Sequence, residues 1–153
     1  MPVRGALSHS DHTLLACSHE ALTFHGITDE PFKGAFALPG GFVDKDEDLD
    51  VAAARELLEE THVQNVPLTQ FGAFGKPGRD PRGHTVTVAY YGVLPSVDAG
   101  TVQADDDAAS AKWLPLSEVP SSSFAFDHAA VVAAGLKRIV AVSRKAVSQV
   151  YRS

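Results

Sequence analysis

Three glutamates on one predicted helical turn are the residues of this sequence best placed to do chemistry. Glu56, Glu59 and Glu60 stand at positions i, i+3 and i+4 of a stretch that we expect to be helical. This spacing puts their Cβ atoms about 5–6 Å apart on one face, where their charges repel one another. Arg55 can pair with Glu59, but it cannot neutralise three acids, and Glu47 adds a fourth just upstream. Oxygen ligands at this spacing suit Mg²⁺ or Mn²⁺.

An exposed acidic helix face is the alternative interpretation, because runs of charge on a helix are usually solvated. The segment before the helix favours a metal site instead. Pro39, Gly40 and Gly41 predict a loop, and glycine lets a backbone carbonyl approach an ion closely. The same loop brings Glu47 back toward the helix. An acidic helix that only faced solvent would have no need of this preceding loop.

The segment from Gly41 to Val63 resembles the Nudix box, written G-x5-E-x7-R-E-U-x-E-E-x-G-U, where U is a bulky aliphatic residue. The residues that match in register are Gly41, Glu47, Arg55, Glu56, Leu57, Glu59, Glu60 and Val63. His62 departs from the pattern, because the box has a glycine there that ends the helix in a left-handed conformation. Histidine tolerates that conformation better than most residues. We therefore expect a stability cost of about 1 kcal/mol or less and no loss of a ligand.

The resemblance implies a role for each matching residue. The three glutamates would be catalytic as metal ligands: Glu56 and Glu60 as the main ligands, and Glu59 for a second ion or for orienting a water. The inner shell would be completed by the carbonyl of Gly40, and the loop would be held to the helix by an ion pair between Glu47 and Arg55. The implied reaction is hydrolysis of a diphosphate bond that joins a nucleoside to another group, with Mg²⁺ or Mn²⁺ as cofactor.

Four further segments, in order along the chain, resemble the ADP-ribose pyrophosphatase branch of this family. They are PFKGAFALPGGFVD, GRDPRGHTVTVAYYG, KWLPLSEVP and FAFDHAAVV. The branch also includes Nudix domains fused to nicotinamide-nucleotide enzymes and to regulators of NAD metabolism. The resemblance thus implies ADP-ribose as the substrate, AMP and ribose 5-phosphate as products, and a homodimer as the assembly. A nucleoside diphosphate sugar, a dinucleotide or a nucleoside triphosphate stays open as the substrate.

A function of another class also stays open, namely a non-catalytic sensor that binds ADP-ribose or a related nucleotide. Regulators of this kind attach the domain to a winged-helix DNA-binding domain, and we expect no room for one after the last predicted helix. The intact glutamates favour catalysis. A plain interaction module is the least favoured hypothesis, because it explains none of the carboxylates.

Outside the box, four side chains are candidates for contact with the substrate. Arg79 and Arg82 stand in a loop rich in Gly and Pro, where guanidinium groups could clamp phosphate or ribose oxygens. An ordinary surface loop is their equal alternative. The resemblance adds Asp107, for which a solvated acid cluster is the alternative, and His128, which could instead only pack. A helix cap accounts for Asp127, its neighbour in the chain.

The elements that must position these residues are short strands and two helices. Strands are predicted at Thr13–Cys17, Ala21–Phe24, Phe36–Leu38, Phe71–Phe74, Thr85–Leu94 and Lys112–Leu116. Helices are predicted at Leu49–Thr61, capped by Asp48 or Asp50, and from Asp127 to at least Val142. The apolar stripe of the second helix consists of Val132, Leu136 and Ile139. This order of elements fits an α/β fold, a Nudix-type α/β/α sandwich with a mixed central sheet.

Bulk properties set the remaining expectations. A length of 153 residues fits a single domain over 1–153, and the single cysteine excludes an intramolecular disulfide. We find neither a signal peptide nor an 18-residue apolar run, so we expect a cytoplasmic protein without membrane contact. The formal charge of −6 argues against a nucleic-acid partner. It permits a small nucleotide substrate, because divalent ions reverse the local charge at an acidic site.

Overall fold

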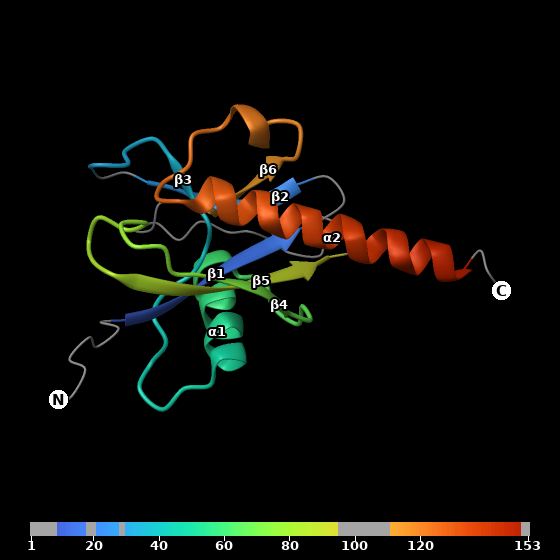
Figure 1. Cartoon of the computed structure of the whole chain (residues 1–153), viewed down its shortest axis with the longest axis horizontal. Coiled ribbons are helices and arrows are strands. Elements are labelled where there is room, and N and C mark those ends of the chain that lie inside the picture. The colour runs from blue at the N-terminus through green and yellow to red at the C-terminus, as the bar shows by residue number, and fades with distance from the viewer. Residues whose placement is uncertain (1–8, 18–20, 28–29, 95–110, 151–153) are drawn as a thin grey trace.

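Two helices cover opposite faces of a mixed sheet in the computed structural model, which describes residues 9–17, 21–27, 30–94 and 111–150 (Figure 1). The strands are β1 (His9–Cys17), β2 (Ala21–Gly26), β3 (Phe36–Ala37), β4 (Thr69–Phe74), β5 (Thr85–Val93) and β6 (Ala111–Pro115). The helices are α1 (Leu49–Thr61) and α2 (His128–Val150), and a 3₁₀ turn, η2, lies at Val119–Ser121. The predicted α/β/α sandwich is confirmed, and each predicted strand has a counterpart whose bounds differ by up to four residues.

Strand β5 joins the two parts of the sheet. On one edge it pairs in parallel with β1 over nine residues, from His9↔Thr85 to Cys17↔Val93, and on its other edge it pairs antiparallel with β4. Strand β2 pairs antiparallel with β1, β3 and β6. The parallel pair between β1 and β5 within these antiparallel pairings makes the sheet mixed, as predicted.

Both faces of the sheet are packed with apolar side chains. The cluster on the α2 side consists of Phe24, Leu38, Ala89, Tyr91, Leu114, Val119, Val131 and Val132. The cluster on the α1 side consists of Ala53, Leu57, Val63, Tyr90 and Leu94. Neighbouring residues of β5 enter opposite clusters, because side chains alternate along a strand. The sheet therefore holds α1 in a fixed position through a buried contact, independently of α2.

Helix α1 begins and ends at the predicted residues. The side chain of Asp48 accepts a hydrogen bond from the N–H of Asp50 at 2.9 Å and caps the start of the helix. At the other end His62 has φ 60° and ψ 8°, and its N–H donates to the carbonyl of Leu58. The expected left-handed conformation of His62 is thereby confirmed, and α1 keeps the end that the box glycine would provide.

Helix α2 begins at His128, one residue after the predicted start, and extends to Val150. The predicted stripe is confirmed, because Val132 is buried and Leu136 and Ile139 pack against the cluster on this side of the sheet. Across the described ranges, no helix combines the length and the apolar character needed to cross a bilayer.

Candidate active site

Arg55 joins the loop that carries Glu47 to the acidic face of α1, which carries Glu56, Glu59 and Glu60. Its Nε and Nη2 donate to the two carboxylate oxygens of Glu47 at 2.8 and 2.9 Å, a bidentate pair. Its Nη1 donates to Oε1 of Glu56 at 2.8 Å and to Oε2 of Glu59 at 3.1 Å. Its Nη2 also reaches the carbonyl of Phe42 at 3.3 Å. One guanidinium therefore holds the loop against the helix and fixes two of the three candidate ligands.

The glycine corner, formed by Gly40 and Gly41, brings the backbone close to the glutamates of α1. The N–H of Gly40 donates to Oε2 of Glu60 at 2.8 Å, and Gly40 has a φ of 150°, which residues with a side chain rarely adopt. A Cβ atom at Gly41 would clash with the carboxylate of Glu56. Both glycines thus permit the close approach between the corner and α1.

Glu56 is the more enclosed of the two glutamates that Arg55 binds on α1. Its side chain is 13% exposed, against 57% for Glu59. Burial raises the pKa of Glu56 above its ordinary value, the hydrogen bond from Arg55 acts in the opposite direction, and the charges of Glu60 and Glu59 raise it further. Burial is thus the main cause of the upward direction, and the charges of Glu60 and Glu59 add to it.

Arg79 lies inside the protein and ties its loop to the start of α2. Its side chain is 4% exposed. Its Nε and Nη2 donate to the carboxylate of Asp127 at 3.0 and 2.7 Å, and its Nη1 donates to the hydroxyl of Thr87. The alternative of an ordinary surface arginine is wrong for Arg79, because long-range partners bury it. A capping role alone does not account for Asp127 either, because its carboxylate accepts two hydrogen bonds from the Arg79 guanidinium.

His128 supports the segment that leads into the glycine corner. It is 7% exposed, and its Nδ1 accepts a hydrogen bond from the N–H of Leu38 at 2.9 Å. Burial lowers the pKa of His128 to about 4, so the imidazole is neutral near pH 7 and Nδ1 stays an acceptor. Leu38 stands two residues before Gly40. This contact is the packing role expected as the alternative for His128, and substrate contact stays a prediction.

Arg82 is held at the surface by a buried carboxylate. Its backbone N–H and its Nε donate to Oδ1 of Asp80 at 2.8 and 3.0 Å, and its Nη2 donates to Oδ2 at 2.8 Å. These bonds lower the pKa of Asp80 and keep it ionised. The guanidinium of Arg82 also lies 4.8 Å over the ring of Phe126.

Asp107 falls outside the described residues, so its role stays a prediction.

Two residues that support this site were not singled out by the sequence pattern. Asp80 carries a weak local signal, since it stands two positions before Arg82, within reach of the arginine's backbone N–H. Tyr90 donates from its hydroxyl to Oδ1 of Asp50 at 2.8 Å and so fixes the first turn of α1 to β5. Burial, followed by the bond to Asp50, raises the pKa of Tyr90 to about 12, which keeps the hydroxyl a donor.

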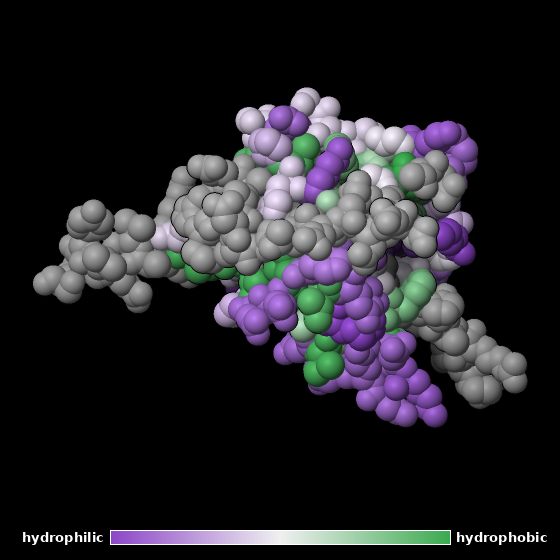
Figure 2. Space-filling view, turned by 180° about the vertical axis from the view of Figure 1, so that it is seen from behind, coloured by the Kyte–Doolittle hydropathy of each residue, from purple (hydrophilic) through white to green (hydrophobic). Residues whose placement is uncertain are grey.

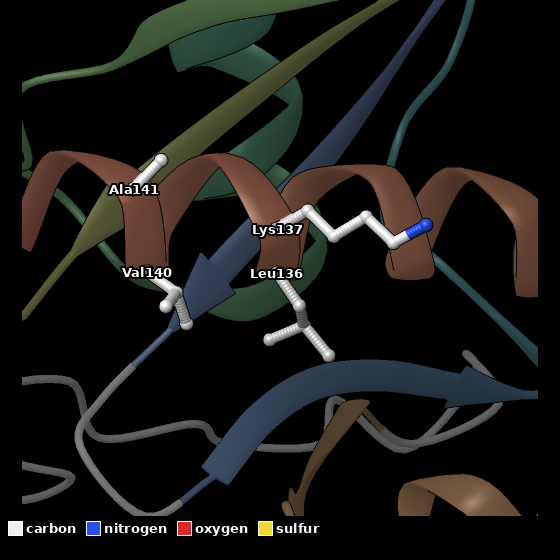
Figure 3. A pocket seen from close by; sticks show the side chains of 4 residues that line it. All are labelled: Leu136, Lys137, Val140 and Ala141. Carbon is white, nitrogen blue, oxygen red and sulfur yellow. The ribbon is translucent and has the colours of Figure 1, made fainter.

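The surface of the molecule separates the acidic face from the apolar hollows. Figure 2 shows hydrophilic residues gathered over α1 and the loop before it. A hollow of about 380 Å³ lies instead on α2, lined by Leu136, Lys137, Val140 and Ala141 (Figure 3). A second, of about 300 Å³, shares Leu136 and extends to η2. Neither lining includes a candidate ligand, so these hollows do not form the metal site.

The chain matches the family model described as NUDIX domain over residues 5–135. The chain belongs to the Nudix family. It is 38% identical over 104 residues to the ADP-ribose pyrophosphatase of Methanocaldococcus jannaschii, which covers 68% of this chain and 59% of that protein. It is 39% identical over 100 residues to the ADPR responsive transcriptional repressor NtrR of Acinetobacter baylyi, which covers 64% of this chain and 39% of that protein. The matched region is thus about two to three fifths of the length of these relatives.

A solved structure supports the same family on geometry. The cocrystal structure of the NUDIX domain of Shewanella oneidensis NrtR complexed with ADP ribose has a TM-score of 0.75 and is 28% identical. The match covers 86% of this chain and 88% of that one. The predicted resemblance to the Nudix family and to proteins that act on or bind ADP-ribose is confirmed.

Nudix hydrolases generally use divalent metal ions, and the Nudix box of this chain fits such an ion. Its donors are carboxylate oxygens and a backbone carbonyl, the ligands that hard divalent cations prefer. Within the described ranges, no three acidic, histidine or cysteine side chains already form a group that could hold an ion. Arg55 instead lies between Glu56 and Glu59 and contacts both. An added cation would reduce the repulsion of Glu56 by Glu60 and Glu59, which is one of the causes that raise its pKa.

Proposed function

We propose that this Nudix domain hydrolyses the diphosphate bond of ADP-ribose to AMP and ribose 5-phosphate, with Mg²⁺ or Mn²⁺ as cofactor. The observation that carries the proposal is the Arg55-centred cluster, in which Glu47, Glu56 and Glu59 converge on one guanidinium. A surface helix that only faced solvent has no need of this arrangement. The similarity to a pyrophosphatase and to an ADP-ribose complex supports the choice of substrate.

We propose three roles for the residues of the site: binding of the ions, orientation of water and support of the ligands. Glu56 and Glu60, with the Gly40 carbonyl, are the proposed ligands, and Glu59 is the proposed second ligand or water-orienting group. Its greater exposure, 57%, suits a group that must meet solvent water. When bound, divalent ions offset the charge of the diphosphate and make water more acidic. Arg55 contacts Glu56 and Glu59 and so keeps both carboxylates on the same face of α1.

The substrate contacts in this proposal come from the segments beside the corner. Arg82 and His128 are proposed to approach the nucleotide, and Asp107 is proposed as a further carboxylate for metal or base chemistry. Arg79 is also proposed as a substrate residue, but it already donates to Asp127 and Thr87. We therefore assign Arg79 the indirect task of fixing the start of α2 beside the substrate.

The wider biological context is proposed on composition and similarity. We propose that residues 1–153 act as a single domain, in the cytoplasm and as a homodimer, with a small nucleotide as the partner. The net charge of −6 supports the expectation of no nucleic-acid partner. We also propose that the domain has no membrane partner.

A non-catalytic sensor is the second candidate, favoured by the 39% identity to a transcriptional repressor. A sensor would bind ADP-ribose tightly and leave it intact in the presence of Mg²⁺ or Mn²⁺. The glutamates of the box favour catalysis, because a sensor needs no cluster of ligands to hold an intact substrate.

Hydrolysis of a nucleotide panel in oxygen-18 water tests both candidates. The panel holds ADP-ribose, a nucleoside diphosphate sugar, a dinucleotide and a nucleoside triphosphate, each with Mg²⁺ or Mn²⁺. We expect ADP-ribose to be the preferred substrate, and mass spectrometry of the products identifies the attacked phosphorus. A strong preference for a triphosphate would reject the assignment of ADP-ribose, and tight binding without turnover would support the sensor.

A further inference from the structure

Phe126 has a backbone conformation that an aromatic residue rarely adopts. Its φ is 53°, in the left-handed region, where a bulky side chain is strained. The ring packs at a centroid distance of 4.6 Å from Phe32 and 5.3 Å from His128. Strained residues persist where the surroundings fix them, and they cluster at functional sites. The backbone is therefore bent so that an aromatic ring stands at this place, between the loop at Phe32 and the start of α2.

The guanidinium of Arg82 lies over this ring and is also bound by a carboxylate. It lies 4.8 Å over the centroid of Phe126, and its edge is bound by Asp80, whose side chain is only 4% exposed. The Arg82 side chain itself is 64% exposed. A surface arginine normally samples many rotamers, but here contacts with a buried carboxylate and an aromatic ring restrict them. The result is a planar cation that is held by two contacts and stays largely exposed.

We propose that Arg82 and Phe126 form a stacking platform for the purine base of a nucleotide, which lies on the outward face of the Arg82 guanidinium. Guanidinium groups stack on flat rings through their planar face, and base stacking accepts any planar ring. The Nε and Nη2 edge of Arg82 is already bound to Asp80, so fewer of its donors are left for a phosphate, which favours stacking. The inference rests on the proposed function, because it assigns the nucleoside half of the same substrate.

A short series of contacts connects the platform to the glutamates. The Phe126 ring packs against His128, and Nδ1 of His128 accepts from the N–H of Leu38 at 2.9 Å. Two residues further on, the N–H of Gly40 donates to Glu60 at 2.8 Å. The platform and the glycine corner are thus connected through His128.

Fluorescence titration with 1,N6-etheno-AMP tests stacking without any need for turnover, because stacking changes the emission of this base. The substitution Arg82→Lys keeps the positive charge and removes the planar group, and Arg138→Lys makes the same change at an exposed arginine of α2 outside the site. We expect R82K to weaken binding about tenfold, as for the loss of a stacked base, and R138K to bind as the wild type does. Ribose 5-phosphate, measured by calorimetry, has no base, so its affinity should be the same in R82K.

The following results would overturn the proposal or require a second variant. Unchanged etheno-AMP binding by R82K would overturn it, and so would an equal loss of affinity for ribose 5-phosphate, which indicates a charge contact with phosphate. If thermal melting shows that R82K does not fold, Phe126→Gly provides the test, because glycine adopts the left-handed conformation without strain. F126G should weaken etheno-AMP binding and leave ribose 5-phosphate binding unchanged, and tight etheno-AMP binding by F126G would overturn the platform.

The failure of the platform can be told apart from the failure of the proposed function. Wild-type protein that binds etheno-AMP through Arg82 but leaves ADP-ribose intact would keep the platform and reject hydrolysis. Wild-type protein that hydrolyses ADP-ribose with a KM that R82K does not change would keep hydrolysis and reject the platform.

Discussion

Protonation of His128 should destabilise the folded protein, because its folded environment accepts only the neutral ring. The side chain is 7% exposed, and its Nδ1 accepts the N–H of Leu38. A protonated Nδ1 cannot accept this bond, and the charge on the ring would be buried. Burial accordingly lowers the pKa of His128 from 6.5 to about 4.

The sign and size of the effect follow from these two values. Because the folded pKa lies below the unfolded one, the unfolded chain takes up the proton first as the pH falls. The stability that depends on neutral His128 is fully present above pH 6.5 and is lost as the pH falls toward 4. Each pKa unit corresponds to about 1.4 kcal/mol, so the whole effect is about 3 kcal/mol. That is a large part of the roughly 5–15 kcal/mol by which domains are stable.

Urea unfolding near pH 7 and near pH 4.5 measures this loss, with His128→Asn as the matched variant. The Oδ1 of asparagine can accept the Leu38 N–H but does not titrate. Carboxylates that titrate in this range are present in both proteins, so their effects cancel in the comparison. We expect the wild type to lose about 2 kcal/mol more than H128N between these two pH values. Equal losses in the two proteins would refute the assignment of His128 as a buried neutral acceptor.

Three further substitutions test single contacts. Gly41→Ala should displace the Glu56 carboxylate and lower kcat for ADP-ribose about tenfold or more, with an unchanged circular dichroism spectrum as the check on folding; wild-type kcat would contradict the close approach. Tyr90→Phe removes the hydrogen bond to Asp50 and should lower the free energy of unfolding by about 1 kcal/mol, so an unchanged urea midpoint would count against it. His62→Gly removes the left-handed strain at the end of α1 and should raise the free energy of unfolding by up to about 1 kcal/mol; a lower melting temperature would show that the imidazole itself stabilises the helix end.

The parts of the site that could be predicted are those fixed by local spacing. Glu56, Glu59 and Glu60 share a helix face by periodicity alone, and α1 begins and ends where Asp48 and His62 predicted. The need for glycine at position 41 is local too, because the glycine corner must approach the helix that follows it in the sequence.

The parts that could not be predicted depend on partners distant in the sequence. His128 and Leu38 are 90 positions apart, and Arg79 and Asp127 are 48 apart. Composition suggested a surface loop for Arg79, since Gly and Pro surround it, but the tertiary fold supplies buried partners for its guanidinium. The left-handed backbone of Phe126 is likewise set by the rings around it and has no glycine or asparagine to signal it.

The central claim is that carboxylates on one turn of α1 hold the ions that make the diphosphate cleavable. Turnover of ADP-ribose by Glu60→Gln tests it most directly, because glutamine can still accept the Gly40 N–H while it loses the charge. Glu118→Gln, at an exposed glutamate before η2, is the matched control. We predict that E60Q lowers kcat about 100-fold or more in saturating Mg²⁺ or Mn²⁺, with wild-type stability, and that E118Q retains full turnover. Near-wild-type turnover by E60Q would contradict the account.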